Sequence, residues 1–342
     1  MTVGKNILKL RKSRGISQEE LANLLLISRQ TVSQWENDQT VPSIDNLLRL
    51  KEIFGVSVDR MLTAEEVKTP QINTDSLDTL CAALAYAMGI NAPMYAAPKN
   101  GELANYIDKA FDGEKADRIV MYNPDAIAQW IYQKYPDYLT NVKANIDKEI
   151  YLSTVMPSVT PVCFGTMYTG AQPAVHGIQG YEKPIIAIDT IFDRLIAAGK
   201  KVALITYGAC SLSKIYLERD MDYFHFDEGG IEAANAKAVE VILRDEHDFI
   251  VIYNGNYDRV MHKTGPESAG ALAELRLNDH IFAMLSHLIA THWKHHNTLI
   301  GFAMDHGCHE IDGGCGSHGL DMPEDINIVH CYKGYPKEKK RV

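Results

Sequence analysis

The chain lacks the features that mark membrane and secreted proteins. No apolar run approaches the roughly 18 residues needed to cross a bilayer. Its opening residues, MTVGKNILKLRKSRG, lack the continuous apolar core of a signal peptide. The six cysteines are spread out with no CxxC pair. We therefore expect a cytoplasmic protein with no membrane partner, in which the cysteines are reduced thiols.

Positive charge is also scarce, because 34 Lys and Arg face 44 Asp and Glu, for a net charge of -10. This balance argues against a surface that binds nucleic acid throughout. The charge is unevenly spread. Residues 1–62 hold nine basic against seven acidic side chains, a net of +2, so the remainder carries -12. A length of 342 residues allows two or three domains, and a mildly basic head on an acidic body predicts two functions.

The first 62 residues are dense in signals that start and stop helices. Ser17 precedes Glu20 by three residues, which is the pattern of a capping box. Ser28 is suited to cap the next helix, and Gly55 to end a later one. The pattern predicts a small all-α domain of five helices. Two short helices joined by a tight turn inside such a bundle form the geometry that places a helix in the major groove.

The residues of this segment also carry a specific resemblance. The opening SQEELA and the string S-x-x-T-V-S-x-W-E-N resemble the Cro/CI-type (lambda-repressor-like) helix-turn-helix domain over residues 4–62. The resemblance implies that Arg29, Gln30 and Gln34 face the bases of double-stranded DNA and that Gln18 contacts phosphate. The alternative is a protein–protein module that kept the fold and lost DNA binding. Because a net charge of +2 attracts phosphate weakly, we expect a homodimer.

A polar stretch without periodicity, residues 63–75, predicts a linker before a second domain over residues 76–342. In this domain, β-branched runs of strand length alternate with helical patterns. The alternation predicts an α/β fold with a mostly parallel sheet covered on both faces, an α/β/α sandwich. The predicted strands are residues 118–123, 202–208, 248–254 and 298–305.

Ligands of such folds bind beyond the carboxyl ends of the strands, and three of the predicted strands end in acidic or imidazole side chains. Asp and His are the ligand types of hard to borderline divalent metals. Each pair alone has an ordinary explanation. Asp258 and His262 could be a solvated pair on one helical turn, and Asp305 and His306 could belong to a turn. A buried Asp costs several kcal/mol unless it is paired or metal-bound, so the recurrence predicts a metal site. The residues concerned are Asp125, Asp258, His262, Asp305, His306 and, twelve residues further on, His318.

A second resemblance follows from a motif around Thr160. The string P-S-x-T-P is followed by T-G nine and ten residues after the Thr, by Pro at thirteen and by H-G at sixteen. The strings D-x-x-x-H-x-x-G-P, D-H-G and G-x-H-G come later in that order. Over about residues 117–331 the chain resembles the type I phosphodiesterase/nucleotide pyrophosphatase branch of the alkaline phosphatase superfamily. Ser158, two residues before the Thr, is a rival nucleophile.

The resemblance implies two divalent ions and a covalent phosphothreonine at Thr160, whose hydroxyl oxygen would also touch the second ion. Ligands of this kind without Cys suit zinc, with manganese as the alternative. The implied ligand sets are Asp258, His262 and His318 for one ion, and Asp125, Asp305 and His306 for the other.

The substrate stays open at this stage. Nucleotide pyrophosphatases of the family carry an Asn about 21 residues after the Thr, where this chain has Tyr181, with Lys183 nearby. Tyr181 and Lys183 are the candidates for contact with phosphate, and monoester, diester and pyrophosphate all fit. The leading hypothesis is a DNA-binding head fused to a two-metal phosphoester hydrolase. The alternatives are a transcription regulator that senses a phosphorylated ligand without turnover, and a transferase or mutase acting on a sugar phosphate.

Overall fold

The computed structural model describes residues 2–14, 16–56, 58–62, 71–311 and 313–339, and the chain divides into two compact units, Met1–Gln71 and Ile72–Val342. Residues 63–70 of the predicted linker lie outside the described residues. Asn73, from the same predicted linker, donates hydrogen bonds to Gln129 Oε1 at 2.7 Å and to the Leu152 carbonyl at 2.8 Å, so it belongs to the second unit. Among the described residues, every helix is too short or too polar to span a bilayer.

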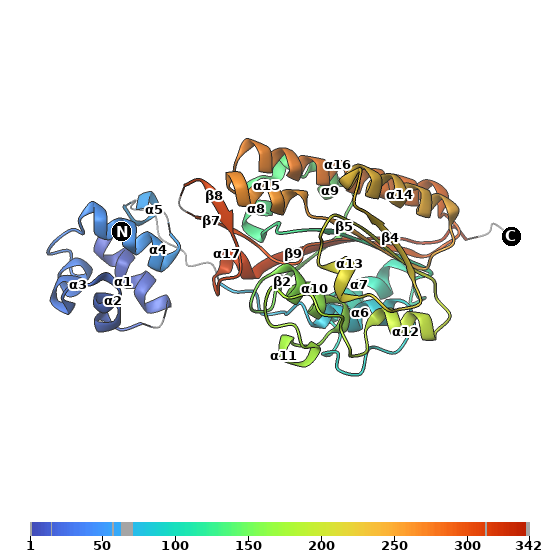
Figure 1. Ribbon diagram of the computed structural model, residues 1–342, viewed down its shortest axis with the longest axis horizontal. Coiled ribbons are helices and arrows are strands. Elements are labelled where there is room, and N and C mark those ends of the chain that lie inside the picture. Colours follow the sequence, from blue (N-terminus) through green and yellow to red (C-terminus); the bar gives the residue numbers. More distant parts are fainter. Residues whose placement is uncertain (1, 15, 57, 63–70, 312, 340–342) are drawn as a thin grey trace. The chain divides into compact units, whose positions relative to one another are not determined.

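The first unit is the small helical bundle that the sequence predicts (Figure 1). Ser17 and Glu20 form the predicted capping box, with each side chain bonded to the other residue's backbone amide. Ser28 Oγ accepts a hydrogen bond from the Thr31 amide at the start of the third helix. Gly55, with φ of 63°, ends the fourth helix. The helices are α1 (Val3–Ser13), α2 (Gln18–Leu25), α3 (Arg29–Glu36), α4 (Ile44–Phe54) and α5 (Val58–Leu62).

A buried carboxylate joins the first three helices of this unit. Glu36, at the end of α3, receives Arg11 Nε from α1 at 2.5 Å and Gln18 Nε2 from α2 at 2.8 Å. Glu36 is 5% exposed, so both donors offset the cost of removing its charge from water. The network fixes how α2 and α3 pack, and therefore the orientation of α3 within the unit.

A seven-stranded sheet forms the centre of the second unit, in the order β2-β9-β6-β1-β5-β3-β4. Neighbours among β6, β1, β5, β3 and β4 are parallel, whereas β9 is antiparallel to both β6 and β2. The strands are β1 (Arg118–Pro124), β2 (Lys148–Ser153), β3 (Val202–Tyr207), β4 (Asp222–Phe226), β5 (Phe249–Asn254), β6 (Thr298–Ala303) and β9 (Asn327–Tyr335). A separate hairpin pairs β7 (His309–Ile311) with β8 (Cys315–Ser317).

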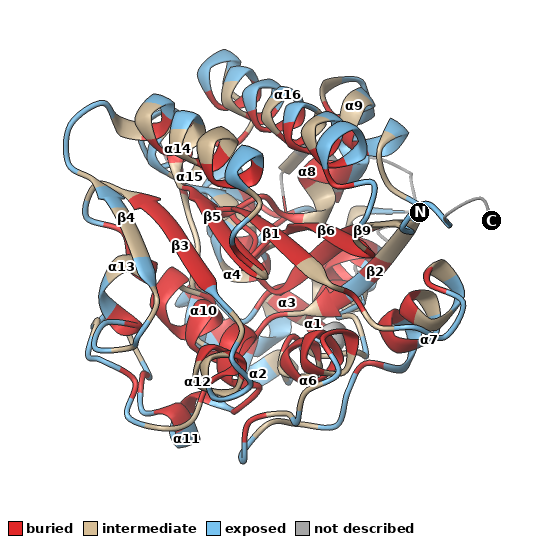
Figure 2. Ribbon diagram, turned by 90° about the vertical axis from the view of Figure 1, so that its right-hand side faces the viewer, coloured by how far each residue is buried: buried red, intermediate tan, exposed pale blue. Residues whose placement is uncertain are grey.

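Helices cover both faces of the sheet, which makes the mostly parallel α/β sandwich that the sequence predicts (Figure 2). One face is covered by α8 (Gln129–Lys134), α9 (Thr140–Ala144), α14 (Gly230–Arg244), α15 (Asn256–Thr264) and α16 (Ala269–His292). On the other lie α6 (Thr79–Ala87), α7 (Gly101–Ala110), α10 (Thr160–Thr169), α11 (Pro173–His176), α12 (Ile191–Ala197) and α13 (Leu212–Ile215). A short helix, α17 (Pro323–Ile326), leads into β9, and a 3₁₀ turn, η1 (Pro136–Tyr138), precedes α9.

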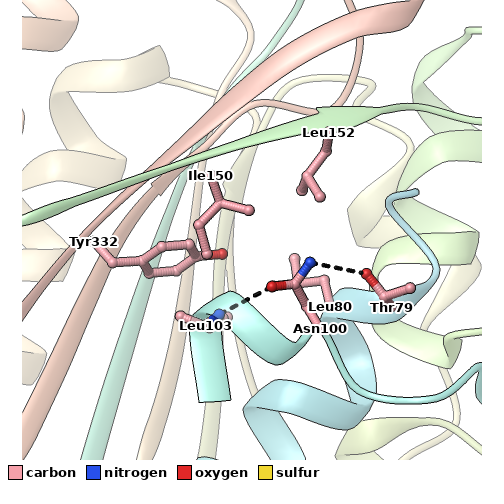
Figure 3. Close-up of a pocket in the computed structure, with 7 residues that line it drawn as sticks. All are labelled: Thr79, Leu80, Asn100, Leu103, Ile150, Leu152 and Tyr332. Carbon is pink, nitrogen blue, oxygen red and sulfur yellow. Dashed lines mark hydrogen bonds between the residues drawn. The ribbon is translucent and has the colours of Figure 1, made fainter. Parts of the chain in front are cut away.

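A small pocket between α6, α7 and the β2–β9 side of the sheet is mainly apolar (Figure 3). Asn100 caps α7 there, since its side chain accepts a hydrogen bond from the Leu103 amide at 2.9 Å and donates to Thr79 Oγ1 at 3.5 Å. The lining residues are Thr79, Leu80, Asn100, Leu103, Ile150, Leu152 and Tyr332. None of them is a predicted site residue, so we assign no binding role to this pocket.

The strand register brings the chemically interesting residues together elsewhere. Pro124 at the end of β1 pairs with Asn254 at the end of β5, and Tyr122 pairs with Phe302 near the end of β6. The carboxyl ends of these three parallel strands therefore meet at one edge of the sheet, which is where a site is expected in this architecture.

The packing of α1 on α3 gives a stability prediction. Replacing a helical Gly by Ala normally stabilises a helix by about 1 kcal/mol, but a Cβ at Gly4 would lie 1.8 Å from the Trp35 carbonyl oxygen. We expect Gly4→Ala to destabilise the first unit by about 1–3 kcal/mol, measured as loss of amide hydrogen-exchange protection in α1–α4. Gly101→Ala, where a Cβ meets nothing within 4 Å, is the control and should leave stability unchanged or raised. Equal protection in both variants would contradict the packing described.

Candidate metal centre

Two buried carboxylates and an imidazole meet at the ends of β1 and β6. Asp125 follows β1, and Asp305 and His306 follow β6. His306 Nε2 lies 3.4 Å from both Asp125 Oδ1 and Asp305 Oδ2. The three side chains are at most 1% exposed. The ligand atoms of this group all lie within 4.8 Å of one another, which is close enough to hold one ion.

Thr160 is the first residue of α10, and its hydroxyl points into this group. Thr160 Oγ1 lies 3.4 Å from Asp125 Oδ2 and 3.3 Å from His306 Nε2. Pro161 at the helix start needs no hydrogen-bond acceptor for its nitrogen, which suits this position. His176 packs against the same helix, with Nε2 3.1 Å from Thr166 Oγ1. Because Thr160 is the first residue of α10, its hydroxyl lies at the positive end of the helix dipole, which favours negative charge beside it.

A second group adjoins the first. Asp258 and His262 lie one turn apart on α15, and His318 comes from the loop after β8. Asp258 Oδ1 lies 3.2 Å from His262 Nε2 and 3.4 Å from His318 Nε2, and the two Nε2 atoms are 3.1 Å apart. The His318 ring centroid lies 4.1 Å from that of His306, so the two groups are neighbours.

The histidine tautomers show which atoms are free to bind a cation. In each ring Nδ1 contacts a backbone carbonyl oxygen, namely that of Gly316 for His262 at 3.0 Å, Gly307 for His306 at 2.9 Å and Ser158 for His318 at 3.1 Å. A carbonyl oxygen only accepts, so Nδ1 carries the proton and Nε2 of the neutral ring presents its lone pair to the carboxylates.

The carboxylate oxygens in front of these lone pairs lack donors. While the facing Nε2 atoms carry no proton, Asp125 Oδ1, Asp258 Oδ1 and Asp305 Oδ2 are buried and accept no hydrogen bond from the described residues. Oxygen and nitrogen lone pairs converge on each group, and a positive charge between them removes their repulsion. The chemistry of the donor set thus fits one divalent cation at each group.

The pKa shifts of the acidic side chains have the same origin. Burial, followed by repulsion from Asp305 and Asp258, raises the pKa of Asp125 well above its usual range. Burial raises the pKa of Asp305 to about 8. Although burial opposes it, hydrogen bonding with His262 and His318 lowers the pKa of Asp258. Hydrogen bonding with Asp258 raises the pKa of His262 to about 9, so a proton supplies the positive charge when no metal does.

Two tyrosines that the sequence analysis missed support the site. Tyr253, in β5, donates a hydrogen bond from its hydroxyl to Asp125 Oδ2 at 2.5 Å. Tyr207, the last residue of β3, accepts the Gly255 amide and donates to Asn256 Oδ1, each at 2.9 Å. These bonds hold one carboxylate of the first group and the loop that leads into α15. The sequence feature that could have identified them is a tyrosine near the end of each of two apolar runs, VALITYG and DFIVIYN.

The predicted phosphate contacts, Tyr181 and Lys183, lie in the loop between α11 and α12. Lys183 Nζ is 5.0 Å from the centroid of the Tyr181 ring and donates to the Ala209 carbonyl at 2.9 Å. The Tyr181 side chain is 64% exposed. Its pKa is raised by partial burial and then by the negative charges of Asp125 and Asp258.

The predicted DNA-contacting residues are distributed over α2 and α3. Arg29 and Gln30 are exposed on the first turn of α3, and Gln34 is partly exposed one turn further along. Gln18 instead uses its side-chain amide to bind Glu36 inside the unit. The roles of all four in contacting DNA stay predictions.

A third group, Asp245 with His295 and His296, lies at the opposite edge of the sheet, before β5 and β6. Each His Nε2 is 3.0 Å from Asp245 Oδ2. Arg118 Nε approaches Asp245 Oδ1 at 3.3 Å, so this carboxylate already has a positive partner. The group is therefore explained by hydrogen bonds and an ion pair.

The comparisons with known proteins agree with this geometry. The sequence profile of the type I phosphodiesterase / nucleotide pyrophosphatase family matches residues 122–326, which is more than half of the chain. The chain belongs to this family. A helix-turn-helix profile matches residues 7–61 of the first unit.

Individual relatives each match a part of the chain. The HTH-type transcriptional activator BcrR of Enterococcus faecalis is 30% identical over 90 residues, 26% of this chain and 44% of the relative. The HTH-type transcriptional regulator ImmR of Bacillus subtilis is 36% identical over 67 residues, 20% of this chain and 53% of the relative. The chain thus spans about half the length of these relatives. Human ectonucleotide pyrophosphatase / phosphodiesterase 5 shares the fold of the second unit, with a TM-score of 0.51 and 11% identity over 64% of this chain and 87% of that chain.

The pKa shifts predict how metal removal changes stability with pH. In protein stripped of divalent ions, Asp305 keeps a proton up to about pH 8, whereas the unfolded chain loses it near the ordinary value of 3.8. The folded state then binds more protons than the unfolded state, so stability falls as pH rises through this window. His262, with its pKa raised from 6.5 to about 9, adds a loss of the same sign at higher pH.

We therefore expect the melting temperature of the second unit, in chelator-treated protein, to be lower at pH 8 than at pH 5. Saturating zinc at pH 8 should restore it, because ligand binding stabilises the folded state. Chelator-treated Asp305→Asn, which keeps the shape but not the charge, should show a flatter dependence. A melting temperature that rises from pH 5 to pH 8 in the chelated wild type would contradict this account of the site.

Proposed function

We propose that this protein is a DNA-binding head fused to a two-metal phosphoester hydrolase that acts through a covalent phosphothreonine at Thr160. The observation that carries the proposal is the convergence of three imidazole Nε2 atoms and three undonated carboxylate oxygens beside the Thr160 hydroxyl. Inorganic cations satisfy such a donor set, and a hydroxyl next to it is the ordinary arrangement of a metal-activated nucleophile.

The two ions would be divided between the two groups of ligands, with Asp258, His262 and His318 holding one, and Asp125, Asp305 and His306 holding the other. When bound, such ions supply Lewis-acid polarisation of a phosphoryl oxygen and lower the pKa of an adjacent hydroxyl. Asp and His ligands without Cys favour zinc, with manganese as the alternative.

The protein side chains then have defined roles. Thr160 Oγ attacks phosphorus, the ester oxygen leaves, and water later cleaves the phosphothreonine to release phosphate or a phosphomonoester. Tyr253 keeps Asp125 oriented through its 2.5 Å hydrogen bond, and the Ser158 carbonyl keeps His318 Nε2 aimed inward. The positive end of α10 favours the negative charge of the phosphoryl group beside Thr160.

A regulator that senses a phosphorylated ligand without turnover is the second candidate, because the relatives of the first unit are transcription regulators. Such a head would act in the compartment that holds DNA, in agreement with the cytoplasmic location expected from the sequence. Homodimerisation would pair two heads on two half-sites. Turnover separates the two candidates, since a sensor binds the phosphoester and leaves it intact.

Activity measurements with zinc or manganese test the nucleophile. We expect the wild type to release p-nitrophenolate from p-nitrophenyl phosphate or from bis(p-nitrophenyl) phosphate, and a chelator to abolish the release. Thr160→Ala should lower kcat by roughly a thousandfold or more, as loss of a nucleophile does. Ser158→Ala, which removes the neighbouring hydroxyl, is the matched control and should keep most of the activity. If Thr160→Ala matched the wild type while Ser158→Ala lost activity, Ser158 would be the nucleophile.

The DNA-binding role is tested on sequences selected from a random duplex library. Arg29→Gln should weaken binding to the selected sequence by about 1–3 kcal/mol and relax the preference at one base pair, because Arg forks onto a single guanine. Lys109→Gln on α7 makes the same charge change in the second unit and should bind as the wild type does. If Arg29→Gln bound the selected duplex as tightly as the wild type does, Arg29 would not contact the bases. If the wild type itself bound selected and scrambled duplexes equally, a protein–protein role for the head would be favoured.

A further inference from the structure

Three of the six candidate metal ligands lie on two connecting segments in the C-terminal part of the chain. Residues 304–308, which carry Asp305 and His306, connect β6 to β7. Residues 318–322, which carry His318, connect β8 to α17. A connecting segment is not held by the regular hydrogen bonds of a helix or sheet, so its backbone groups need other partners. The positions of these ligands therefore depend on what binds the two segments.

Asp325, on α17, binds both segments at once. Its backbone carbonyl accepts the Gly307 amide at 2.7 Å, and its Oδ2 accepts the Leu320 amide at 2.9 Å. Gly307 follows His306 directly, and its own carbonyl oxygen lies 2.9 Å from Nδ1 of that ring. Leu320 comes two residues after His318. One residue therefore holds the backbone beside a histidine of each ligand group.

The segment beside His306 also packs directly against α17. A Cβ on Gly307 would lie 2.0 Å from the Glu324 carbonyl oxygen, so a side chain does not fit at this position. The missing side chain is what allows the Gly307 amide to reach the carbonyl of Asp325. A displacement of α17 would consequently move the residue next to His306.

His309 supplies the second hydrogen bond of the Asp325 carboxylate. Its Nδ1 lies 2.7 Å from Asp325 Oδ1, and the carboxylate is 0% exposed whereas the imidazole is 12% exposed. A buried carboxylate is costly unless donors surround it, and Leu320 and His309 give one donor to each oxygen. His309 begins β7, where it pairs with Ser317, the residue before His318. It thus stands at the start of the hairpin that joins the two segments.

We propose that Asp325 is a positioning residue for both metal ions and that His309 fixes the orientation of its carboxylate. The inference rests on the proposed function and adds to that site a residue that acts through the backbone of two ligand segments. Without its acceptor, the Gly307 or Leu320 amide is free to move, and the neighbouring imidazole loses its aim. Residues that orient metal ligands in this way typically contribute about 10- to 100-fold to metal affinity or activity.

Asp325→Asn tests the proposal in the full-length protein, because it keeps the shape of the side chain and replaces one acceptor oxygen by an NH2 group. The Leu320 amide or His309 Nδ1 then faces a donor and loses its partner. We expect the affinity for both zinc ions, measured by competition with a chromophoric chelator, to fall about tenfold or more. At saturating zinc, kcat on the p-nitrophenyl ester that the wild type cleaves should fall while KM changes little, because the reacting groups are displaced.

A matched pair of variants at His309 isolates the hydrogen bond to Asp325. His309→Asn keeps an N–H donor close to the place of Nδ1, so it should retain the zinc affinity and kcat of the wild type. His309→Ala leaves Asp325 Oδ1 without this donor and should lose zinc affinity as Asp325→Asn does.

Two further variants show whether the effect is specific to this position. Asp222→Asn breaks another His–Asp contact of 2.7 Å, with His247, where β4 begins and before β5. It should bind zinc as the wild type does. Tyr253→Phe removes a hydrogen bond to Asp125 in the first ligand group alone and should weaken one of the two ions, whereas Asp325→Asn should weaken both.

The outcomes separate this inference from the proposed function. If the wild type binds two zinc ions and Asp325→Asn binds them as tightly with the same kcat, only this inference fails. A lower melting temperature in chelator, with zinc affinity and kcat unchanged, would show that Asp325 only stabilises the fold and would also overturn it. Should Asp325→Asn not fold, equal zinc affinity of His309→Asn and His309→Ala would contradict the inference. If the wild type binds neither zinc nor manganese, the proposed function fails and this inference fails with it.

Discussion

The second unit depends on one electrostatic constraint, which is that two buried carboxylates, a partly buried third one and three imidazole lone pairs meet at the edge of its sheet. Asp125 and Asp305 have their carboxylates at most 1% exposed, and taking such charges out of water costs several kcal/mol unless a positive charge accompanies them. The strand register makes the meeting unavoidable, because β1 lies between β5 and β6 and all three end at the same edge. A fold that places acids in this way is stable only with cations or protons between them.

The same constraint ties together segments that are far apart in the chain. Two of the three histidines are oriented by a carbonyl from a distant segment: Gly316, in the β7–β8 hairpin, orients His262, and Ser158, in the loop before α10, orients His318. The loop that precedes Thr160 and the hairpin that precedes His318 are thus parts of one arrangement. A shift in either segment turns an Nε2 away from its group, so the two Asp/His groups and Thr160 are held in register by the same hydrogen bonds.

The sequence predicted the parts whose signals are local. The central strands β1, β3, β5 and β6 are apolar, β-branched runs, and the polar residues directly after β1, β5 and β6 are the ones that converge. It did not predict β2, β4 and β9, because KEIYLS and DYFHF lie at the edges of the sheet, where exposed and buried positions mix. β9 carries His, Lys and Gly within its run. Tyr253 and Tyr207 read as core residues, since their hydroxyl partners, Asp125 and Asn256, are defined only by the packing of other strands and loops.

The distribution of charge assigns the two ligands that we propose, duplex DNA and a phosphoester, to different units of the chain. Residues 63–342 carry a net charge of -12, and a duplex needs a broad positive surface to offset its dense row of phosphates. An acidic body repels such a polymer, while the divalent ions that we propose for the site would still attract a compact anion, because opposite charges matter most within about a Debye length, roughly 8–10 Å. We therefore expect the ligand of the second unit to be a small phosphorylated molecule, as proposed above, and not the DNA that the head would bind.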